Sequence, residues 1–377
     1  MLGHLTRRYS VRSAQAAEGP TRVAVLYQEL EPPIINGQKK PKKPGGYQDS
    51  GADIAFNLRN TEVGVITPLP NPDPAEQCGW TFPDTEEGIL KALGAGATHL
   101  WANTILFASH PLQTSSRIGA FLDQVRVVGQ GPLAVELYDD KDYVNNLLRE
   151  AGGFTLPRAW HLPATQTVPS LAELKDITFP VVAKPARGRG SYGVKVCRSP
   201  DDLVTHVNAL REELLSVMVE EFLAGEEATV TVMPPTKDKN DYWSLPVVTR
   251  FNHQDGIAPY NGVVAVTSNS RAVPGCERDF IYRQVMRECE GVARFLGTTA
   301  PIRIDVRRRR DSSSSKFVIF DVNMKPNMTG PGRPGRDEQA SLTLIAAAAL
   351  GWDYKELLER ILETASTLRD LRAITPR

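Results

Sequence analysis

The chain has 377 residues, of which 41% are hydrophobic and 23% charged, so it is an ordinary globular chain with room for two or three domains. Lysine plus arginine and aspartate plus glutamate each total 44, so no overall basic field attracts nucleic acid or an anionic membrane surface. The four cysteines form no CxxC pair and no zinc-like cluster with histidine, which indicates reduced thiols, and no apolar run is long enough to span a membrane. We therefore expect neither nucleic acid nor a membrane as a partner.

The first 20 residues are basic, contain serine and have their first acid at Glu18. This composition is typical of a mitochondrial transit peptide, and the stretch 7–10, RRYS, resembles a processing site. A disordered leader ahead of the first strand is the interpretation we favour. The expected location is cytoplasmic, with a mitochondrial location as the alternative.

From residue 21 onward, the apolar pattern predicts strands that alternate with helices. Strands are expected at 22–27, 62–67, 98–107 and 125–128, and helices at 53–60, 85–93 and 117–124. Such alternation is typical of a parallel α/β sheet. The segment 31–46 is rich in proline, glycine and lysine and predicts a long loop, either a lid over a site or a solvated insertion.

The pattern changes near Gly129, after which strands and helices alternate less regularly. Helices are expected at 140–151, 200–215, 279–296, 342–350 and 354–362, and strands at 180–184, 193–197, 218–222, 227–233, 302–307 and 316–322. The fold class is therefore α/β, with α+β character in the C-terminal part. We expect a leader at 1–20, an N-terminal α/β domain at 21–135, a central subdomain at 136–216 and a C-terminal subdomain at 217–377.

A glycine-rich stretch follows Lys184, and its glycines at 188, 190 and 193 match GxGxxG, a spacing that three phosphate sites share. A dinucleotide fold needs a helix directly after the loop, but residues 194–197 alternate like a strand. A protein kinase needs HRD and DFG triplets, and the chain contains neither. A glycine flap between antiparallel strands fits best, with Lys184 as a phosphate-binding cation, and a solvated surface hairpin is the alternative.

Two expected strands near the end of the chain carry polar side chains at alternate positions. Arg303 and Asp305 share one face of the first strand. Asp321 and Asn323 share one face of the second strand. If those faces meet, two carboxylates and an amide oxygen converge in a way that suits Mg²⁺, and the neighbouring guanidinium is placed to stabilise developing negative charge. The alternative is that these polar side chains form the solvent-exposed face of a hairpin. The four arginines at 307–310 that follow predict a solvated turn.

Taken together, these motifs resemble the ATP-grasp superfamily and, within it, D-alanine–D-alanine ligase. The resemblance covers roughly residue 24 to the C-terminus, and it implies three α/β domains with ATP held between two sheets. It implies ATP contacts from Lys141, Lys184, Gly190, Ser191, Glu220, Glu221, Leu223 and Glu227. It implies Mg²⁺ ligands, with Mn²⁺ as an alternative ion, at Asp305, Asp321 and Asn323, and catalytic roles for Arg303 and Lys184.

The departures from the family pattern fall where its amino acid substrates bind. Asn327 replaces the glycine of the family's PGMT motif, Lys325 lies just before it, and an arginine-rich insertion at 330–340 follows. Segments 28–33 and 107–111 replace two N-terminal loops of the family. The substrate candidates are Glu29, His110, Lys325, Asn327 and Ser341. We expect the chemistry to be retained with a substrate other than D-alanine, and we expect the arginine-rich insertion to hold a second carboxylate.

The resemblance implies an ADP-forming ligase that activates a carboxylate, with an amino acid as the favoured substrate, as an acyl phosphate and couples it to an amine. Its partners would be a small-molecule carboxylate and amine, and a homodimer is compatible with the sequence. Two alternatives remain open at this point: another ATP-grasp activity that phosphorylates a carboxylate, and a nucleotide-binding protein of the same fold without catalysis.

Overall fold

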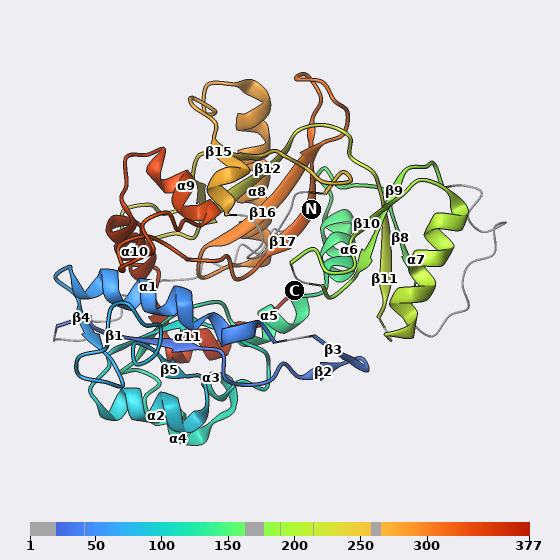
Figure 1. Cartoon of the computed structure of the whole chain (residues 1–377). Helices are drawn as coiled ribbons and strands as arrows, with labels where there is room; N and C mark the ends of the chain where they lie inside the picture. The colour runs from blue at the N-terminus through green and yellow to red at the C-terminus, as the bar shows by residue number, and fades with distance from the viewer. Residues whose placement is uncertain (1–19, 41, 163–176, 189, 214, 258–264) are drawn as a thin grey trace, which may run out of the picture.

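The computed structural model describes residues 20–40, 42–162, 177–188, 190–213, 215–257 and 265–377. The leader expected at 1–20 therefore lies outside the described residues, apart from Pro20. Within the described ranges, no helix has both the length and the apolar character that crossing a membrane requires. The described elements are arranged in three large sheets and one two-stranded sheet, with helices packed around them (Figure 1).

The first sheet has the strand order β18-β7-β6-β1-β4, with β5 also paired to β1. Its strands are β1 Arg22–Tyr27, β4 Gly64–Ile66, β5 Phe82–Pro83, β6 His99–Asn103, β7 Arg126–Val128 and β18 Ser366–Thr367. The pairs of β1 with β4, β5 and β6 are parallel, as is β6 with β7, which confirms the predicted parallel sheet. β18 pairs antiparallel with β7, so the last residues of the chain return to the N-terminal sheet.

Helices cover both faces of this sheet, so β1 is buried from Val23 to Leu26. Ala24 and Leu26 pack into one core cluster, and Val23 and Val25 pack into another. The covering helices are α1 Gln48–Arg59, α2 Glu86–Gly94, α3 Pro111–Thr114, α4 Ser116–Gly119 and α11 Leu368–Ala373. The α11 segment and β18 are elements that the sequence pattern did not predict.

The second sheet is antiparallel, in the order β10-β9-β11-β8. It contains β8 Ala159–Leu162, β9 Val181–Pro185, β10 Lys195–Cys197 and β11 Val217–Glu221, with helices α6 Lys141–Ala151 and α7 Pro200–Glu212 beside it. The glycine-rich stretch connects β9 to its antiparallel neighbour β10. The arrangement agrees with the predicted flap and excludes the strand-to-helix order of a dinucleotide fold.

The third sheet follows the order β15-β14-β12-β16-β17, with β13 paired to β12. Its strands are β12 Glu227–Met233, β13 Trp243–Ser244, β14 Val248–Arg250, β15 Ser270–Ala272, β16 Ile302–Arg308 and β17 Phe317–Asn323. The helices of this part are α8 Phe280–Leu296, α9 Leu342–Ala348 and α10 Tyr354–Leu362, with the short turn η2 Val266–Ser268. The strand β16 reaches Arg308, so the solvated turn predicted at 307–310 is wrong for Arg307 and Arg308.

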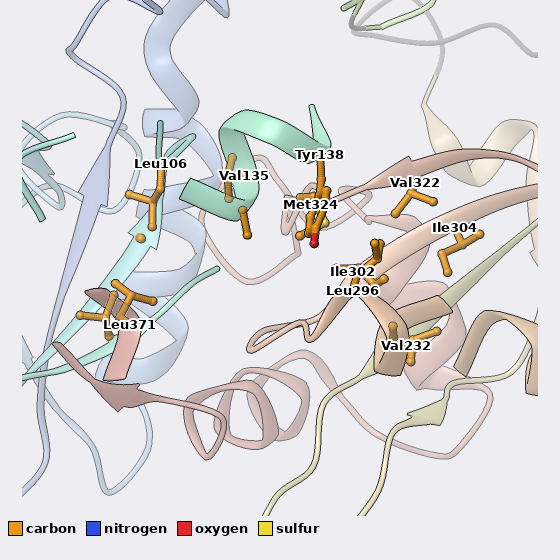
Figure 2. Packing of buried hydrophobic residues seen from close by; sticks show 14 of the residues in the cluster. Leu106, Val135, Tyr138, Val232, Leu296, Ile302, Ile304, Val322, Met324 and Leu371 are labelled. Atoms are coloured by element: carbon orange, nitrogen blue, oxygen red, sulfur yellow. The ribbon is translucent and has the colours of Figure 1, made fainter. Parts of the chain in front are cut away.

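One hydrophobic cluster joins the N-terminal sheet to the third sheet. Val135 of α5 Pro132–Tyr138 lies between Leu106 on one side and Met324 on the other, and Tyr138 of the same helix belongs to the same cluster (Figure 2). The same cluster continues into Ile302 and Ile304 of β16. Because these side chains are all buried, the two sheets share a packed core that fixes the position of β16 and β17.

The segment 31–46 forms the small hairpin of β2 Ile34–Ile35 and β3 Gln38–Lys39, followed by the turn η1 Pro44–Tyr47. The segment extends to the second sheet, where the side-chain amide of Gln38 donates to the hydroxyl group of Ser216, the residue before β11, at 2.7 Å. Lys40 pairs with Asp139 at 2.5 Å. The predicted long loop is therefore anchored in the described structure, and it extends from the first sheet toward the central part of the chain.

Candidate active site

We call the first sheet, its helices and the segment 31–47 the N-terminal unit. A cavity of about 1090 Å³ lies where the second and third sheets meet this unit. Ligand pockets typically measure about 300–1,000 Å³, so this cavity is large enough for a nucleotide and further small molecules. The predicted site residues that line it are Lys141, Lys184, Gly190, Ser191, Glu220, Glu221, Leu223, Glu227, Arg303, Asp305, Asp321, Asn323, Lys325, Asn327 and Ser341. Glu29 and His110 do not line it.

Lys184 lies on β9, and its ammonium group is buried against the neighbouring strands. Its Nζ is 2.5 Å from the Glu220 carboxylate of β11 and donates to the carbonyl oxygen of Phe320 at 3.1 Å. Phe320 is the extra residue of a β-bulge, because Asp305 pairs with Asp321 while the next residue, Val306, pairs with Ile319. The bulge thus brings a β17 carbonyl to the β9 lysine.

The Glu220 carboxylate is the partner that holds Lys184 in place. It also accepts a hydrogen bond from the Asn145 side chain of α6 at 3.0 Å. Burial raises the pKa of the Glu220 carboxyl group, and the nearby ammonium of Lys184 works against that shift. The buried pair is therefore sensitive to removal of either partner, because the other would be left with an uncompensated charge.

Lys141 opens helix α6 and brings a second ammonium group to the cavity. Asp140 caps this helix by accepting hydrogen bonds from the backbone amides of residues 142 and 143. The Nζ of Lys141 lies 3.2 Å from Asp321 and donates to the flap carbonyl of Gly188 at 3.3 Å. Burial acts to lower the pKa of Lys141, but Asp321 and Asp139 outweigh it and raise that pKa, so the group stays charged.

The paired strands β16 and β17 bring the predicted metal ligands together. Arg303 faces Asn323 across the ladder, and Asp305 faces Asp321. The guanidinium of Arg303 makes two hydrogen bonds to Asp305, at 2.9 and 3.0 Å, and Asn323 donates to the same carboxylate at 3.0 Å. Burial acts to raise the pKa of Asp305, but Arg303 outweighs it and lowers that pKa, so Asp305 is ionised at neutral pH.

The donor set at this position fits a hard divalent cation such as Mg²⁺. It comprises two carboxylates and one amide on neighbouring strand positions. One oxygen of Asp321 is buried and accepts no hydrogen bond, although Lys141 lies near it. No group of three or more histidine, cysteine, aspartate or glutamate side chains in the described ranges has a metal-binding arrangement, so an ion here would rely on the amide oxygen of Asn323.

Glu227 begins β12 at the other end of the cavity, and its surroundings add residues that the sequence did not indicate. The His253 ring nitrogen Nε2 lies 2.8 Å from its carboxylate, and Arg307 lies 3.6 Å from it. Arg307 also donates to the carbonyl oxygens of Gly225 and Gly256, and its guanidinium lies over the Phe222 ring. Nothing in the local sequence connects His253 with residue 227, so the sequence gives no signal for this contact.

The N-terminal unit contributes a further wall of the cavity, in part from the segment 31–46, for which a lid over a site was one of the two sequence interpretations. Lys40, Lys42, Lys43 and Tyr47 all line it. The backbone of Tyr47 has a positive φ of 68°, which is unusual for a bulky residue. Its carbonyl oxygen accepts hydrogen bonds from Asn103 at 3.0 Å and from Ser50 at 3.2 Å, which hold the strained turn at the start of α1.

Three of the five substrate candidates lie in the cavity. Ser341 is buried and caps α9 by accepting a hydrogen bond from the amide of Leu344 at 3.1 Å. The side chains of Asn327 and Thr329 hydrogen-bond each other. The Nζ of Lys325 lies 3.3 Å from the centroid of the Tyr47 ring.

The other two candidates lie apart from it. His110 is buried in the N-terminal unit, where its Nδ1 accepts a hydrogen bond from the amide of Leu112 and its Nε2 lies 3.4 Å from Asp84. Glu29 is exposed, and its backbone amide donates to the same Asp84. His110 therefore caps α3 and joins a buried polar cluster, and Glu29 contacts that cluster through its backbone amide.

The arginine-rich insertion does not hold a second carboxylate in the cavity, contrary to our expectation. Arg333 and Arg336 both bind Asp53 of α1, which is completely buried. Arg336 makes two hydrogen bonds to this carboxylate, each 2.8 Å long. Arg333 also donates to the backbone carbonyl oxygens of Glu76 and Asp49. Both guanidinium groups therefore bind groups of the protein itself.

The three-sheet arrangement, with two lysines and a cluster of acids around one cavity, defines an ATP-grasp protein. Solved structures with this fold agree along nearly the whole chain. A D-alanine–D-alanine ligase from Bacillus anthracis in complex with ATP matches with a TM-score of 0.62 over 94% of this chain and 99% of that one, at 19% identity. A D-Ala:D-Ser ligase from Enterococcus faecalis matches with a TM-score of 0.61 over 92% of this chain and 99% of that one, at 14% identity.

The chain belongs to the D-alanine–D-alanine ligase family, because the model of that family's C-terminal domain matches residues 158–363. A putative D-alanine–D-lactate ligase from Streptomyces coelicolor is 29% identical over 65% of this chain and 66% of its own length. D-alanine–D-alanine ligase A from Bacillus cereus is 26% identical over 64% and 72%. The chain thus spans about two thirds of these relatives, and its identification as an ATP-grasp ligase of this family is confirmed.

Proposed function

We propose that the protein is an ATP- and Mg²⁺-dependent ligase that activates a small carboxylic acid as an acyl phosphate and couples it to an amine, with release of ADP and phosphate. The observation that supports this proposal best is the shared cavity. Two lysine ammonium groups from α6 and β9 and the acid cluster of β16 and β17 all line it. Had the two sets faced separate cavities, they would not have been able to hold the same triphosphate.

In this proposal Lys141 and Lys184 bind the phosphates. Both ammonium groups contact acidic or carbonyl oxygens on or next to β17, so they lie beside the Asp321 position. Asp305, Asp321 and Asn323 would hold Mg²⁺, and the ion would offset the negative charge of the transferring phosphoryl group. Mn²⁺ has the same preference for oxygen ligands and is the alternative ion.

The adenosine end would bind between the β11 hinge and the start of β12. Glu221 and Leu223 line that part of the cavity, and the Glu227 carboxylate is oriented by His253 and Arg307. A carboxylate fixed in this way suits recognition of the two ribose hydroxyl groups, as the family resemblance implies. The flap with Gly190 and Ser191 would cover the phosphates and exclude water that hydrolyses an acyl phosphate.

Arg303 is the residue that we assign to the acyl-transfer step. Its guanidinium holds Asp305 through Nε and Nη2 and lines the cavity at the same time. A fixed positive charge at this point stabilises the tetrahedral oxyanion that forms when the amine attacks the acyl phosphate. The amine and carboxylate substrates stay proposals, as does the predicted homodimer.

The proposal is tested by ATP binding and ADP release. Because Lys184→Ala leaves the buried Glu220 without its partner, the double variant Lys184→Met with Glu220→Gln separates folding from function. Calorimetry with ATP and Mg²⁺ should show at least about tenfold weaker binding for this variant, since a charge-assisted phosphate contact is lost. Substrate-dependent ADP release should fall about 100-fold or more.

The matched control is Lys195→Met, in which an exposed lysine paired with Asp202 is replaced on the neighbouring strand β10. The control should bind ATP as the unmodified protein does. Thermal unfolding of all variants establishes that they are folded. The proposal would be wrong if the unmodified protein failed to bind ATP with Mg²⁺, or if a folded double variant bound it equally well.

A further inference from the structure

A tight turn follows β14 at the end of the cavity that we assign to adenosine. Gln254 and Ile257 exchange two backbone hydrogen bonds of 2.9 Å each across Asp255 and Gly256, and both central residues have positive φ. Two consecutive positive φ angles are typical of a type I′ turn, for which Asp-Gly is a preferred pair. The local sequence therefore favours this conformation, and the turn holds the residue before it, His253, in a defined place.

This turn leaves the third sheet and packs on the second. A side-chain Cβ at Gly256 would lie 3.2 Å from the ring of Phe222, which follows β11, and 3.2 Å from Val196 of β10. The carbonyl oxygen of Gly256 accepts a hydrogen bond from Arg307 of β16 at 2.7 Å. The turn thus contacts both sheets, and Gly256 itself lines the cavity.

Two side chains contact the Glu227 carboxylate here, and both use the same oxygen. His253 Nε2 lies 2.8 Å from Oε2, and Nη1 of Arg307 lies 3.6 Å from it. A carboxylate oxygen accepts hydrogen bonds, so His253 is the donor. Glu227 is buried and lines the cavity. Within the described part of the chain neither contact uses Oε1, so this oxygen is the one that a ligand in the cavity can meet.

Of these two contacts, the one with His253 sets the orientation of the carboxylate. At 3.6 Å, Arg307 is beyond hydrogen-bond distance and supplies charge, whereas His253 at 2.8 Å makes a directional bond. A glutamate side chain has several rotatable bonds, and fixing them only when a ligand binds weakens the affinity. The histidine fixes them beforehand, which matters most for a ligand with two adjacent hydroxyl groups.

We propose, on the basis of the ligase function proposed above, that His253 is a positioning residue that holds Glu227 toward the ribose and makes the protein select ribonucleotides over deoxyribonucleotides. His253 does not line the cavity, so it acts through the carboxylate of Glu227. Its contribution is therefore confined to nucleotides whose sugar hydroxyl groups donate to that carboxylate. A nucleotide without them gains nothing from the histidine.

The test compares ATP with 2′,3′-dideoxy-ATP, which lacks both ribose hydroxyl groups. Calorimetry on the full chain with Mg²⁺ gives the two dissociation constants, and their ratio measures recognition of the ribose. We expect the unmodified protein to bind ATP at least about tenfold more tightly than the analogue, because charge-assisted hydrogen bonds are gained. Glu227→Leu should abolish this preference, since it removes the carboxylate that accepts them.

Two polar variants of the histidine differ only in reach. His253→Gln keeps an amide donor near the position of Nε2 and should keep the preference for ATP. His253→Asn is one carbon shorter, so its amide does not reach Oε2, and the preference should fall at least about threefold. His253→Leu also lacks the donor and replaces His253→Asn if that variant does not fold. His99→Gln changes a histidine of the first sheet outside the cavity and should leave the preference unchanged.

The outcomes separate this inference from the ligase proposal. If a folded variant without the donor keeps the full preference, or weakens both nucleotides equally, His253 has no positioning role and the inference is overturned. It is overturned as well if His253→Gln loses the preference, or if the unmodified protein binds both nucleotides alike. In each of these cases ATP still binds and the ligase proposal stands. If neither nucleotide binds to the unmodified protein, the ligase proposal fails first, and the inference fails with it.

Discussion

At the scale of single residues, His99 shows how burial alone sets the chemistry of a side chain. It lies on β6 in the first sheet, away from the cavity. Its Nδ1 is 2.9 Å from the hydroxyl oxygen of Thr98. Burial lowers the pKa of His99 to about 4, and the charge of Arg126 adds to the effect. The ring is therefore neutral in the folded protein at physiological pH.

This shift predicts a pH-dependent loss of stability. The unfolded chain has a histidine pKa near 6.5, so below that pH the unfolded state takes up a proton that the folded state does not. Stability from this group is complete above about pH 6.5 and falls as the pH drops toward 4. Thermal unfolding between pH 7 and 4.5 should show a smaller decrease in Tm for His99→Gln than for the unmodified protein. Equal decreases would contradict the assignment.

The strand pairing of the candidate metal ligands was predictable from sequence, because each of the two strands has a short alternating motif. Asp305, Asp321 and Asn323 lie at strand positions whose alternation places them on one face, and the ladder pairs them as predicted. The partners that orient such residues were not predictable. Glu220 holds Lys184, and His253 approaches Glu227, because strands far apart in sequence pair in the third dimension.

At the scale of elements, the turn before α1 gives a matched pair of glycines. Gly45 and Gly46 both have positive φ, but a Cβ at Gly45 would meet nothing within 4 Å. At Gly46 it would lie 2.0 Å from the Gln28 carbonyl oxygen. Gly45→Ala should cost about 1 kcal/mol from backbone strain alone. Gly46→Ala should cost about 3 kcal/mol or more, since the turn must also move away from β1.

Denaturant unfolding of the two variants measures this difference. If both variants lost the same stability, the close approach to Gln28 would have no energetic weight.

Element boundaries were less predictable than the elements themselves. The first helix was expected at 53–60, but α1 begins at Gln48. Ser50 and Gly51 are poor helix formers, and they are buried against the first sheet, so tertiary packing overrides their weak local preference. The helix expected at 117–124 is shorter, with α4 ending at Gly119. The strand β18 is two residues long and depends on β7, so no local pattern marks it.

At the scale of the whole molecule, the predicted parts are joined by contacts that no local pattern contains. The core cluster of Figure 2 packs α5 between the first and third sheets. Asp53 of α1 is tied to the insertion that follows β17 by Arg333 and Arg336. The sequence predicted the ATP-grasp fold, because its motifs occur in the family's order. Nothing in the sequence indicated that the arginines of the insertion would bind Asp53 of α1 instead of a substrate.

The contacts of Asp53 with Arg333 and Arg336, which we call the Asp53 cluster, lead to a prediction about the stability of the whole protein. Asp53→Asn removes the charge that compensates two guanidinium groups, of which Arg333 is only 2% exposed. Breaking such a buried network costs about 3–5 kcal/mol, because the remaining charges stay buried without a partner. Asp241→Asn breaks a solvent-exposed pair with Arg294 and should leave the stability nearly unchanged. Unfolding in denaturant compares the two variants.

Replacing all three members of the cluster together distinguishes compensation from packing. In the triple variant Asp53→Leu, Arg333→Met and Arg336→Met, no buried charge is left alone, so the loss should be smaller than for Asp53→Asn. If the triple variant were the least stable, the hydrogen bonds of Arg333 to the carbonyl oxygens of Glu76 and Asp49 would be what joins the insertion to α1. If Asp53→Asn cost no more than Asp241→Asn, the cluster would not hold the N-terminal unit against the third sheet, and the wall of the cavity that contains Tyr47 would need another support.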